Sequence, residues 1–292
     1  MEIFGKEIQI KKQGCNVMGE TGKPVSPSVN LFVKVTKRCN ARCLFCSNAG
    51  CRDTEGPFNV DKLFEIIDEI QQNDILVNRV NITGGEPSVV PELVVDILER
   101  AKQNRFSNIH FHLNTNGLLP QSQQLMRHER WNSISMSLHH YDVNALSELY
   151  GVKISEDAFK LTGIDKRKLN VSCNLIKGYI DSDKEVHRML DYTLSLGIYR
   201  IGFVALMKVN DYCKERFIDL NEIHLSEIPH VYFTKSMDRG ADCKCSNYLY
   251  NKGLNILEIY MRNYMNPNYC ESSLVYDGAF LRQGFYQDNI IY

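Results

Sequence analysis

Short apolar segments that alternate with helical stretches fill the chain between residues 30 and 210. In six segments, hydrophobic residues recur at every second position, as they do in a strand with one buried face. The predicted strands cover residues 31–36, 79–83, 109–114, 133–139, 170–176 and 200–206. Between them, apolar residues recur every three or four positions, for example from Leu63 to Ile70, which predicts amphipathic helices. Six βα units in a row predict an α/β fold, an incomplete (β/α)6 parallel barrel or partial TIM barrel.

Two flanking regions differ from this pattern. Glycine and proline interrupt residues 1–29, so we expect an irregular cap with a short strand or hairpin at the bottom of the barrel. Beyond residue 210, helical turns lead to a break at Pro229, and apolar residues at 254–261 and 273–276 predict a pair of strands. The predicted parts are a cap at 1–29, a partial barrel at 30–210 and a small α+β extension at 211–292.

The alternation also predicts what lines the interior of the barrel. On the third, fourth and fifth strands, apolar side chains share one face and polar side chains share the other. The polar positions are His110, His112, Asn114, Ser133, Ser135, Ser137, His139, Asn170, Ser172 and Asn174. Burying a polar group without a partner costs roughly 1–3 kcal/mol. We therefore expect either a bound polar ligand with water, or side chains that satisfy one another. Cys173 falls on the apolar face and should be a core thiol.

Composition excludes several classes of protein. The 292 residues are 43% hydrophobic and carry a net charge of −1, so we expect one large domain and no nucleic-acid-binding surface. No apolar run approaches the roughly 20 residues of a membrane helix, and the N-terminus lacks the apolar core of a secretion signal. Ten cysteines in such a chain indicate metal binding in a reducing cytoplasm rather than disulfides.

The densest cysteine motif follows the first strand. Cys39-Asn-Ala-Arg-Cys43-Leu-Phe-Cys46 is a C-x3-C-x2-C array, and three thiolates can hold three irons of a 4Fe–4S cluster. The fourth iron then lacks a protein ligand, and an open coordination position is typical of a reactive site. The alternatives are a zinc knuckle and a chance grouping, although zinc sites usually add a second pair of ligands later in the chain.

A second motif supports the cluster. Thr83-Gly84-Gly85-Glu86-Pro87 follows the second strand, and in this order and spacing the two motifs resemble those of the radical S-adenosylmethionine (SAM) superfamily. The residues that the resemblance implies as cluster ligands are Cys39, Cys43 and Cys46. Those implied to contact SAM are Phe45, beside the adenine, and Gly84, Gly85 and Glu86, around the methionine ammonium group.

Within the superfamily, the barrel resembles the molybdopterin-pathway branch. That resemblance implies further SAM contacts from Ser137, Asn174 and Met207, with a plain core role as the alternative for Met207. It also places Asn114 and Asn170 where that branch holds its substrate.

Two histidines end the fourth strand. His139 and His140 are candidates for a catalytic acid or base, because histidine titrates near neutrality. His139 points inward by strand parity and is the stronger candidate. A satisfied, non-catalytic histidine is the alternative.

The C-terminal part resembles the twitch or SPASM extension of radical SAM enzymes, which carries an auxiliary iron–sulfur cluster. The candidate ligands are Cys243, Cys245 and Cys270, with Cys213 or substrate in a fourth position. The match is partial, because such extensions usually show C-x2-C or C-x3-C pairs and this chain has C-x-C. Zinc, or a hairpin with incidental thiols, is the alternative.

The molybdopterin-forming enzyme itself matches poorly near the C-terminus. Its Gly-Gly tail is absent, since the chain ends Asn289-Ile-Ile-Tyr292, and Glu271-Ser272-Ser273 replaces its nucleotide-binding arginines. The resemblance therefore does not carry that enzyme's substrate to this chain.

The implied chemistry is reductive cleavage of SAM to a 5′-deoxyadenosyl radical, which removes a hydrogen atom from substrate. A flavodoxin- or ferredoxin-type protein would donate the electron. We expect a small-molecule or nucleotide-like substrate, since no peptide-recognition domain precedes the barrel. The alternatives are a maturase of a ribosomally made peptide and a non-catalytic iron–sulfur carrier or sensor. A carrier would need neither Gly84-Gly85-Glu86 nor a polar interior.

Overall fold

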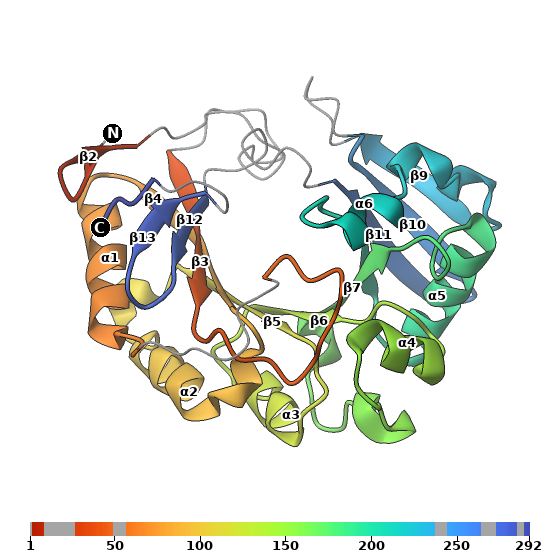
Figure 1. Ribbon diagram of the computed structural model, residues 1–292, viewed down its shortest axis with the longest axis horizontal. Helices are drawn as coiled ribbons and strands as arrows, with labels where there is room; N and C mark the ends of the chain where they lie inside the picture. The colour runs from red at the N-terminus through yellow and green to blue at the C-terminus, as the bar shows by residue number, and fades with distance from the viewer. Residues whose placement is uncertain (1, 9–26, 49–56, 237–243, 264–272, 285–288) are drawn as a thin grey trace.

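One curved sheet organises the chain. The computed structural model describes residues 2–8, 27–48, 57–236, 244–263, 273–284 and 289–292. Among them, eleven strands form a sheet in the order β13-β12-β3-β4-β5-β6-β7-β8-β11-β10-β9. Figure 1 shows this sheet as an open crescent with helices along its outer side. Its end strands do not pair with each other among the described residues, so the barrel is not closed.

All six predicted strands form and lie side by side in chain order. Each pairs in parallel with the next. They are β3 (Ser28–Lys34), β4 (Leu76–Thr83), β5 (His110–Thr115), β6 (Ser133–Ser137), β7 (Leu169–Leu175) and β8 (Arg200–Ala205). The predicted α/β fold with a parallel core is therefore confirmed.

Helices cover the convex face of this core (Figure 1). They are α1 (Val60–Gln72), α2 (Pro91–Arg100), α3 (Pro120–Met126), α4 (Val143–Tyr150) and α5 (Asp183–Ser195). The short α6 (Asp211–Glu215) lies instead at the mouth of the crescent, where its Cys213 packs with Phe45. Asn59 directly precedes α1, and its side chain accepts a hydrogen bond from the Lys62 backbone N–H and so caps the helix. The predicted apolar face of α1, including Ile66 and Ile67, is fully buried. Each such side chain contributes about 1.5–3 kcal/mol.

Strand alternation separates an apolar layer from a polar concave face, as predicted. Phe111, Leu113, Ile134 and Met136 are fully buried on the helix side. The intervening positions of β6 and β7 are partly exposed on the concave side. Cys173 is fully buried in the core, and burial raises the pKa of its thiol.

The C-terminal strands extend the core sheet at both ends. They are β9 (Val231–Ser236), β10 (Ser246–Lys252), β11 (Asn255–Arg262), β12 (Ser273–Tyr276) and β13 (Leu281–Gln283). The two strands predicted here as a pair do form, but they are not neighbours. Instead β11 pairs in parallel with β8, and β12 pairs in parallel with β3. Open edges of a parallel core offer unpaired backbone groups, and these strands satisfy them.

The predicted division into a cap, a partial barrel and a C-terminal extension stays a prediction. One sheet runs through residues on both sides of position 210. The predicted N-terminal hairpin forms from β1 (Glu2–Ile3) and β2 (Lys6–Glu7). Short 3₁₀ turns are η1 (Pro87–Val89), η2 (Asn104–Phe106), η3 (Glu156–Phe159), η4 (Lys166–Lys168), η5 (Leu220–Glu222) and η6 (Leu225–Glu227). No helix in the described ranges is long and apolar enough to cross a bilayer.

Candidate functional site

The cysteine array lies on the loop that leaves β3. Figure 1 shows this loop, in orange-red, running from the end of β3 toward α4, where the Arg42 N–H donates to the Tyr150 carbonyl at 2.7 Å. Cys39, Cys43 and Cys46 are partly exposed and form no disulfide. Backbone N–H groups of Ala41 and Asn48 point at the sulfurs of Cys39 and Cys46, each at 3.4 Å. Such contacts stabilise thiolates and tune clusters that thiolates hold, so the donor set fits an iron–sulfur cluster.

The Gly-Gly-Glu motif continues the β3–β4 ladder beyond the strand ends. The Val35 N–H donates to Thr83 O at 3.0 Å, the Gly85 N–H to Thr36 O at 2.7 Å, and the Glu86 N–H to Arg38 O at 2.9 Å. The motif and the start of the cysteine loop are therefore one hydrogen-bonded unit.

Close backbone approach requires the two glycines. A Cβ atom on Gly84 would lie 2.3 Å from Thr36 O, and one on Gly85 would lie 1.9 Å from Arg38 O. Gly84 also has φ +139°, a conformation that side chains disfavour. Its carbonyl accepts a hydrogen bond from Asn48 Nδ2 at 2.7 Å, which ties the far end of the loop to the motif.

The Glu86 carboxylate is buried and binds the protein itself. Oε1 accepts hydrogen bonds from the Ser88 N–H, the Ser88 hydroxyl and the Thr115 hydroxyl, and Oε2 accepts one from the Asn116 N–H. Burial raises the pKa of this carboxyl, and these hydrogen bonds oppose the rise. The side chain thus joins the ends of β4 and β5. Its implied contact with the ammonium group of SAM stays a prediction.

Phe45 and His139 meet at the mouth of the concave face. Their rings pack edge to face with centroids 4.8 Å apart, and His139 Nδ1 accepts the Asn174 N–H at 3.1 Å. Burial lowers the pKa of His139 to about 3, so at neutral pH the ring is uncharged with its proton on Nε2. The acid or base role of His139 stays a prediction.

In the lower half of the concave face, the polar side chains form hydrogen bonds with one another. The Ser133 hydroxyl lies 2.6 Å from both His110 Nε2 and His112 Nδ1. The Ser135 hydroxyl lies 3.1 Å from His112 Nε2 and contacts the Asn170 amide at 2.9 and 3.1 Å. Here the polar side chains satisfy one another, which was one of the two sequence alternatives.

The upper half, next to the cysteine loop, is different. Ser137 and Ser172 are paired across β6 and β7, and Asn174 follows on β7. Their side chains are partly exposed on the concave side. Within the described part of the chain, none of the three side chains has a hydrogen-bond partner, and no side-chain polar atom is both buried and unsatisfied. These groups are therefore accessible to a ligand.

Comparison with known proteins decides the family. The sequence profile of the Radical SAM superfamily matches residues 33–193, which is more than half of the 292 residues. The chain belongs to the radical SAM superfamily. Members of this superfamily use a 4Fe–4S cluster and SAM.

Two relatives of this radical SAM protein are GTP 3′,8-cyclases. That of Limosilactobacillus fermentum is 25% identical over 219 residues, which are 66% of this chain and 64% of the relative. That of Thermodesulfovibrio yellowstonii is 27% identical over 204 residues, which are 66% of this chain and 61% of the relative. The chain thus spans less than two thirds of the length of each. The likeness to the molybdopterin branch is confirmed.

A solved structure supports the radical SAM fold. SuiB of Streptococcus suis, bound to its precursor peptide SuiA, superposes with a TM-score of 0.52 at 21% identity. The superposition covers 65% of this chain and 42% of SuiB. At this identity the likeness concerns the fold alone.

Other predicted residues of the radical SAM site fall in different places. Cys213 is fully buried and packs with Phe45 and Leu206, so it lies beside the first cysteine array. Met207 is partly exposed just beyond β8. Cys245 is buried, and its sulfur accepts the Asn263 N–H at 3.2 Å.

Cys243 and Cys270 lie outside the described residues. The auxiliary cluster of the radical SAM extension therefore stays a prediction.

Sequence reasoning missed several residues that shape the site. Asn210 caps α6 and donates from Nδ2 to the Leu44 carbonyl at 2.8 Å. Thr115 and Asn116 anchor Glu86. The signal for the last two was their position directly past the predicted third strand, where functional side chains of parallel barrels gather.

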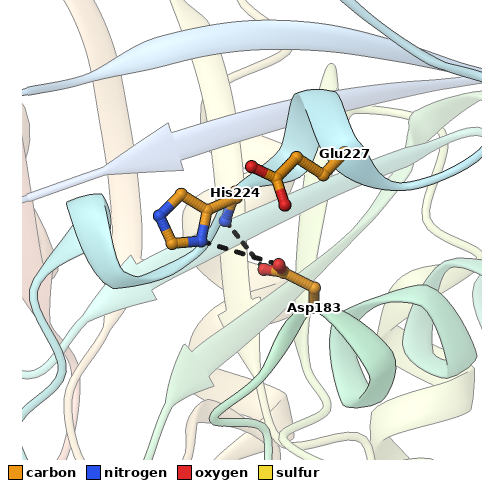
Figure 2. Close-up of side chains that lie close together, drawn as sticks. All are labelled: Asp183, His224 and Glu227. Carbon is orange, nitrogen blue, oxygen red and sulfur yellow. Dashed lines mark hydrogen bonds and ion pairs between the residues drawn. The ribbon is translucent and has the colours of Figure 1, made fainter.

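A separate group of side chains of the types that ligate metals lies near the surface of the protein. Figure 2 shows Asp183, His224 and Glu227, whose ligand atoms lie within 4.8 Å of one another. The His224 N–H donates to Asp183 Oδ1 at 2.7 Å, which ties the segment after α6 to the start of α5. His224 and Glu227 are exposed, and the arrangement alone assigns the group no metal.

Proposed function

We propose that this chain is a radical SAM enzyme that acts on a small-molecule or nucleotide-like substrate bound in the concave face of the sheet. The observation that carries the proposal is the accessible polar layer of Ser137, Ser172 and Asn174, where SAM and a polar substrate would meet. The cysteine loop reaches this layer through Phe45, which packs on His139, and His139 accepts the Asn174 N–H. Beneath the layer, polar side chains that hydrogen-bond to one another, such as His112 with Ser133 and Ser135 with Asn170, give a rigid base. An electron carrier or sensor would not need such a layer.

The proposal assigns roles to named side chains. Cys39, Cys43 and Cys46 would hold the 4Fe–4S cluster, and SAM would bind beside it. When bound and reduced, this pair supplies a 5′-deoxyadenosyl radical that removes a hydrogen atom from substrate. Phe45, which packs edge to face with His139, offers an apolar surface to the adenine. Met207 offers a second apolar surface.

On the polar side, Ser137 and Asn174 offer hydrogen bonds to the ribose and the carboxylate of SAM. Asn114 and Asn170 face the substrate, and the hydrogen bonds of Asn170 to Ser135 fix the orientation of its amide. Gly84 and Gly85 position the loop because their lack of a Cβ lets β4 approach it.

The substrate class is tested by uncoupled and coupled SAM cleavage. Reconstituted protein is incubated anaerobically with SAM and dithionite, with either a small-molecule fraction or a peptide fraction of a cell extract. We expect the small-molecule fraction to raise 5′-deoxyadenosine formation above the substrate-free rate. Stimulation by the peptide fraction alone would instead identify a peptide maturase, and no 5′-deoxyadenosine under any condition would identify a carrier.

We propose further that Cys243, Cys245 and Cys270 hold an auxiliary iron–sulfur cluster. The variant Cys243→Ala/Cys270→Ala should then lose about one cluster of iron and keep uncoupled SAM cleavage. The measurement is iron and sulfide content per chain after reconstitution. Unchanged iron would remove the second cluster.

A further inference from the structure

A cavity of about 570 Å³ lies beside the cysteine loop. Its walls come from the segment that follows β5, from α3 and from the segment that follows α4, and Asn40 of the cysteine loop completes the lining. No described strand residue lines it, so it is separate from the polar layer of Ser137, Ser172 and Asn174. Its volume is within the range of cavities that hold small organic ligands.

Much of the lining is apolar. The side chains that contribute this surface are Leu118, Leu119, Val152, Ile154 and Ala158. Ile154 is buried, and the other four are partly exposed, so apolar surface inside the cavity is in contact with water. Removing such surface from water is favourable by about 25 cal/mol per Å². An occupant with an apolar body would therefore be stabilised here.

Two cations belong to the same lining. Arg127 and Lys153 both line the cavity and are exposed. Arg127 donates from Nε and Nη2 to the Thr162 carbonyl at 3.2 and 2.9 Å, which fixes the guanidinium and, among the described residues, leaves Nη1 without an acceptor. Asp157 is the only described acidic side chain in the lining, and its carboxylate pairs with Lys160 at 2.7 Å. The cavity thus combines an apolar lining with an excess of positive charge.

Both walls of the cavity are hydrogen-bonded to the cysteine loop. On the β5 side, Asn116 donates from Nδ2 to Asn40 Oδ1 at 2.8 Å, and its own Oδ1 accepts the Leu118 N–H at 3.0 Å. On the α4 side, the Arg42 N–H donates to the Tyr150 carbonyl at 2.7 Å. Because Asn40 also lines the cavity and directly follows the first cluster cysteine, an occupant would contact both walls and the loop between them.

We propose that this cavity binds a small organic anion, with an apolar body and one carboxylate or phosphate group, and that the bound anion holds the cysteine loop in place. The apolar body packs against Ile154 and Ala158, and the anionic group pairs with Arg127 and Lys153. Asn40 adds an amide contact from the loop. The anion binds without any covalent step, and the site is independent of the substrate that the concave face takes.

Linkage explains how an occupant acts on the cluster. A ligand that binds only while the loop is in place stabilises that state by RT ln(1 + [L]/Kd). Iron leaves the three cysteines faster when the loop opens, so a ligand at about ten times its Kd should slow iron release by up to about 11-fold. The coupling is reciprocal, so loss of iron should also weaken the binding of the anion.

Fluorescent probes test binding without enzymatic turnover. The reconstituted full chain is titrated with 1-anilinonaphthalene-8-sulfonate, an anion with an apolar body, and with N-phenyl-1-naphthylamine, the same molecule without its sulfonate. We expect the anion to bind at least tenfold more tightly than the neutral probe. Displacement by 1-naphthoate and by 1-naphthyl phosphate then compares a carboxylate with a phosphate group, and the tighter of the two identifies the head group. Inorganic phosphate, which lacks the apolar body, should displace the probe at least tenfold less well.

Variants locate the site. Arg127→Glu/Lys153→Glu should weaken binding of the sulfonate at least tenfold, and Arg127→Gln/Lys153→Gln should weaken it less. Ala158→Trp, which fills the cavity and keeps its charge, should also weaken binding at least tenfold. The matched control is Lys184→Glu/Lys235→Glu, which makes the same charge change at exposed positions on α5 and β9 and should bind within twofold of wild type.

Iron release tests the link to the loop. With the tighter naphthyl anion at about ten times its Kd, the wild type should pass iron to a chelator at least threefold more slowly than without it. Ala158→Trp should release iron at the same rate with and without the anion. Neither measurement uses SAM, so both are independent of the proposed function.

Four results would each overturn the proposal. They are wild-type binding by both the charge-reversed and the filled variant, equal binding of the neutral probe, displacement by inorganic phosphate as good as by the naphthyl anions, and an iron release rate that the anion leaves unchanged.

Discussion

At the scale of single residues, the site depends on Gly84 and Gly85 because neither has a Cβ atom. Gly85 lies so close to Arg38 O that even a methyl group would overlap it, and Gly84 meets Thr36 O in the same way. The sequence resemblance assigned both residues to SAM. The structure adds a reason that concerns the protein alone, since the cysteine loop packs directly on their backbone.

Replacement of Gly85 by alanine should therefore destabilise the protein strongly. A Cβ 1.9 Å from a carbonyl oxygen forces the backbone to move, and we expect a loss of about 3 kcal/mol or more in the free energy of unfolding. The control is Gly253→Ala, where φ is +63° and no atom lies within 4 Å, so the cost should be about 1–2 kcal/mol. Urea denaturation measures both, and equal costs would contradict the packing argument.

Buried neutral histidines should make stability depend on pH. Burial, with a smaller effect of Arg79, lowers the pKa of His112 to about 3 from an ordinary 6.5. As pH falls below 6.5, His112 becomes protonated in the unfolded chain but stays neutral in the folded chain. The free energy of unfolding therefore falls by about 1.4 kcal/mol per pH unit for this residue. His112→Asn should reduce that slope by about this amount between pH 6 and 4. Identical slopes for variant and wild type would show that His112 is charged in the fold.

At the scale of elements, the sequence predicted the six core strands and their polar face because each strand has one buried face. Burial of alternate residues leaves a period of two in the sequence, as at Phe111 and Leu113. The sequence could not decide that the polar side chains of the lower concave face hydrogen-bond to one another, because the bonds of Ser133 to His110 and His112 depend on strand register. Asn210 was missed for a similar reason, since its partner Leu44 lies 166 residues away.

The link between α6 and the cysteine loop should control how firmly the loop holds iron. Asn210→Asp keeps an oxygen that can cap Cys213 N but loses the N–H donor to Leu44 O. One hydrogen bond is worth about 0.5–1.5 kcal/mol, so we expect iron to pass to a chelator roughly 3- to 10-fold faster.

Asn59→Asp is the matched control, because Asn59 caps α1 through its side-chain oxygen and, among the described residues, its hydrogen bonds go to α1 and to Tyr276 and not to the loop. It should lose iron at the wild-type rate. Equal rates for Asn210→Asp and Asn59→Asp would contradict the coupling.

At the scale of the whole molecule, the chain after residue 210 completes the sheet at both of its edges. The pattern at 254–261 and 273–276 identified two strands correctly but could not identify their partners, since short strands of either edge look alike in sequence. The strand β9 was missed because its residues after Val231 are exposed on both faces, which removes the alternation that marks a strand. The crescent thus stays open, and its concave face stays accessible beside the cysteine loop.

The account as a whole depends on a redox-active cluster that Cys39, Cys43 and Cys46 hold and that cleaves SAM. The most direct measurement is 5′-deoxyadenosine released per chain by anaerobically reconstituted protein with dithionite and SAM, for wild type and for Cys39→Ala. We predict steady release by the wild type and none above background by the variant. Equal release by both proteins, or none by a wild type that contains iron and sulfide, would contradict the account.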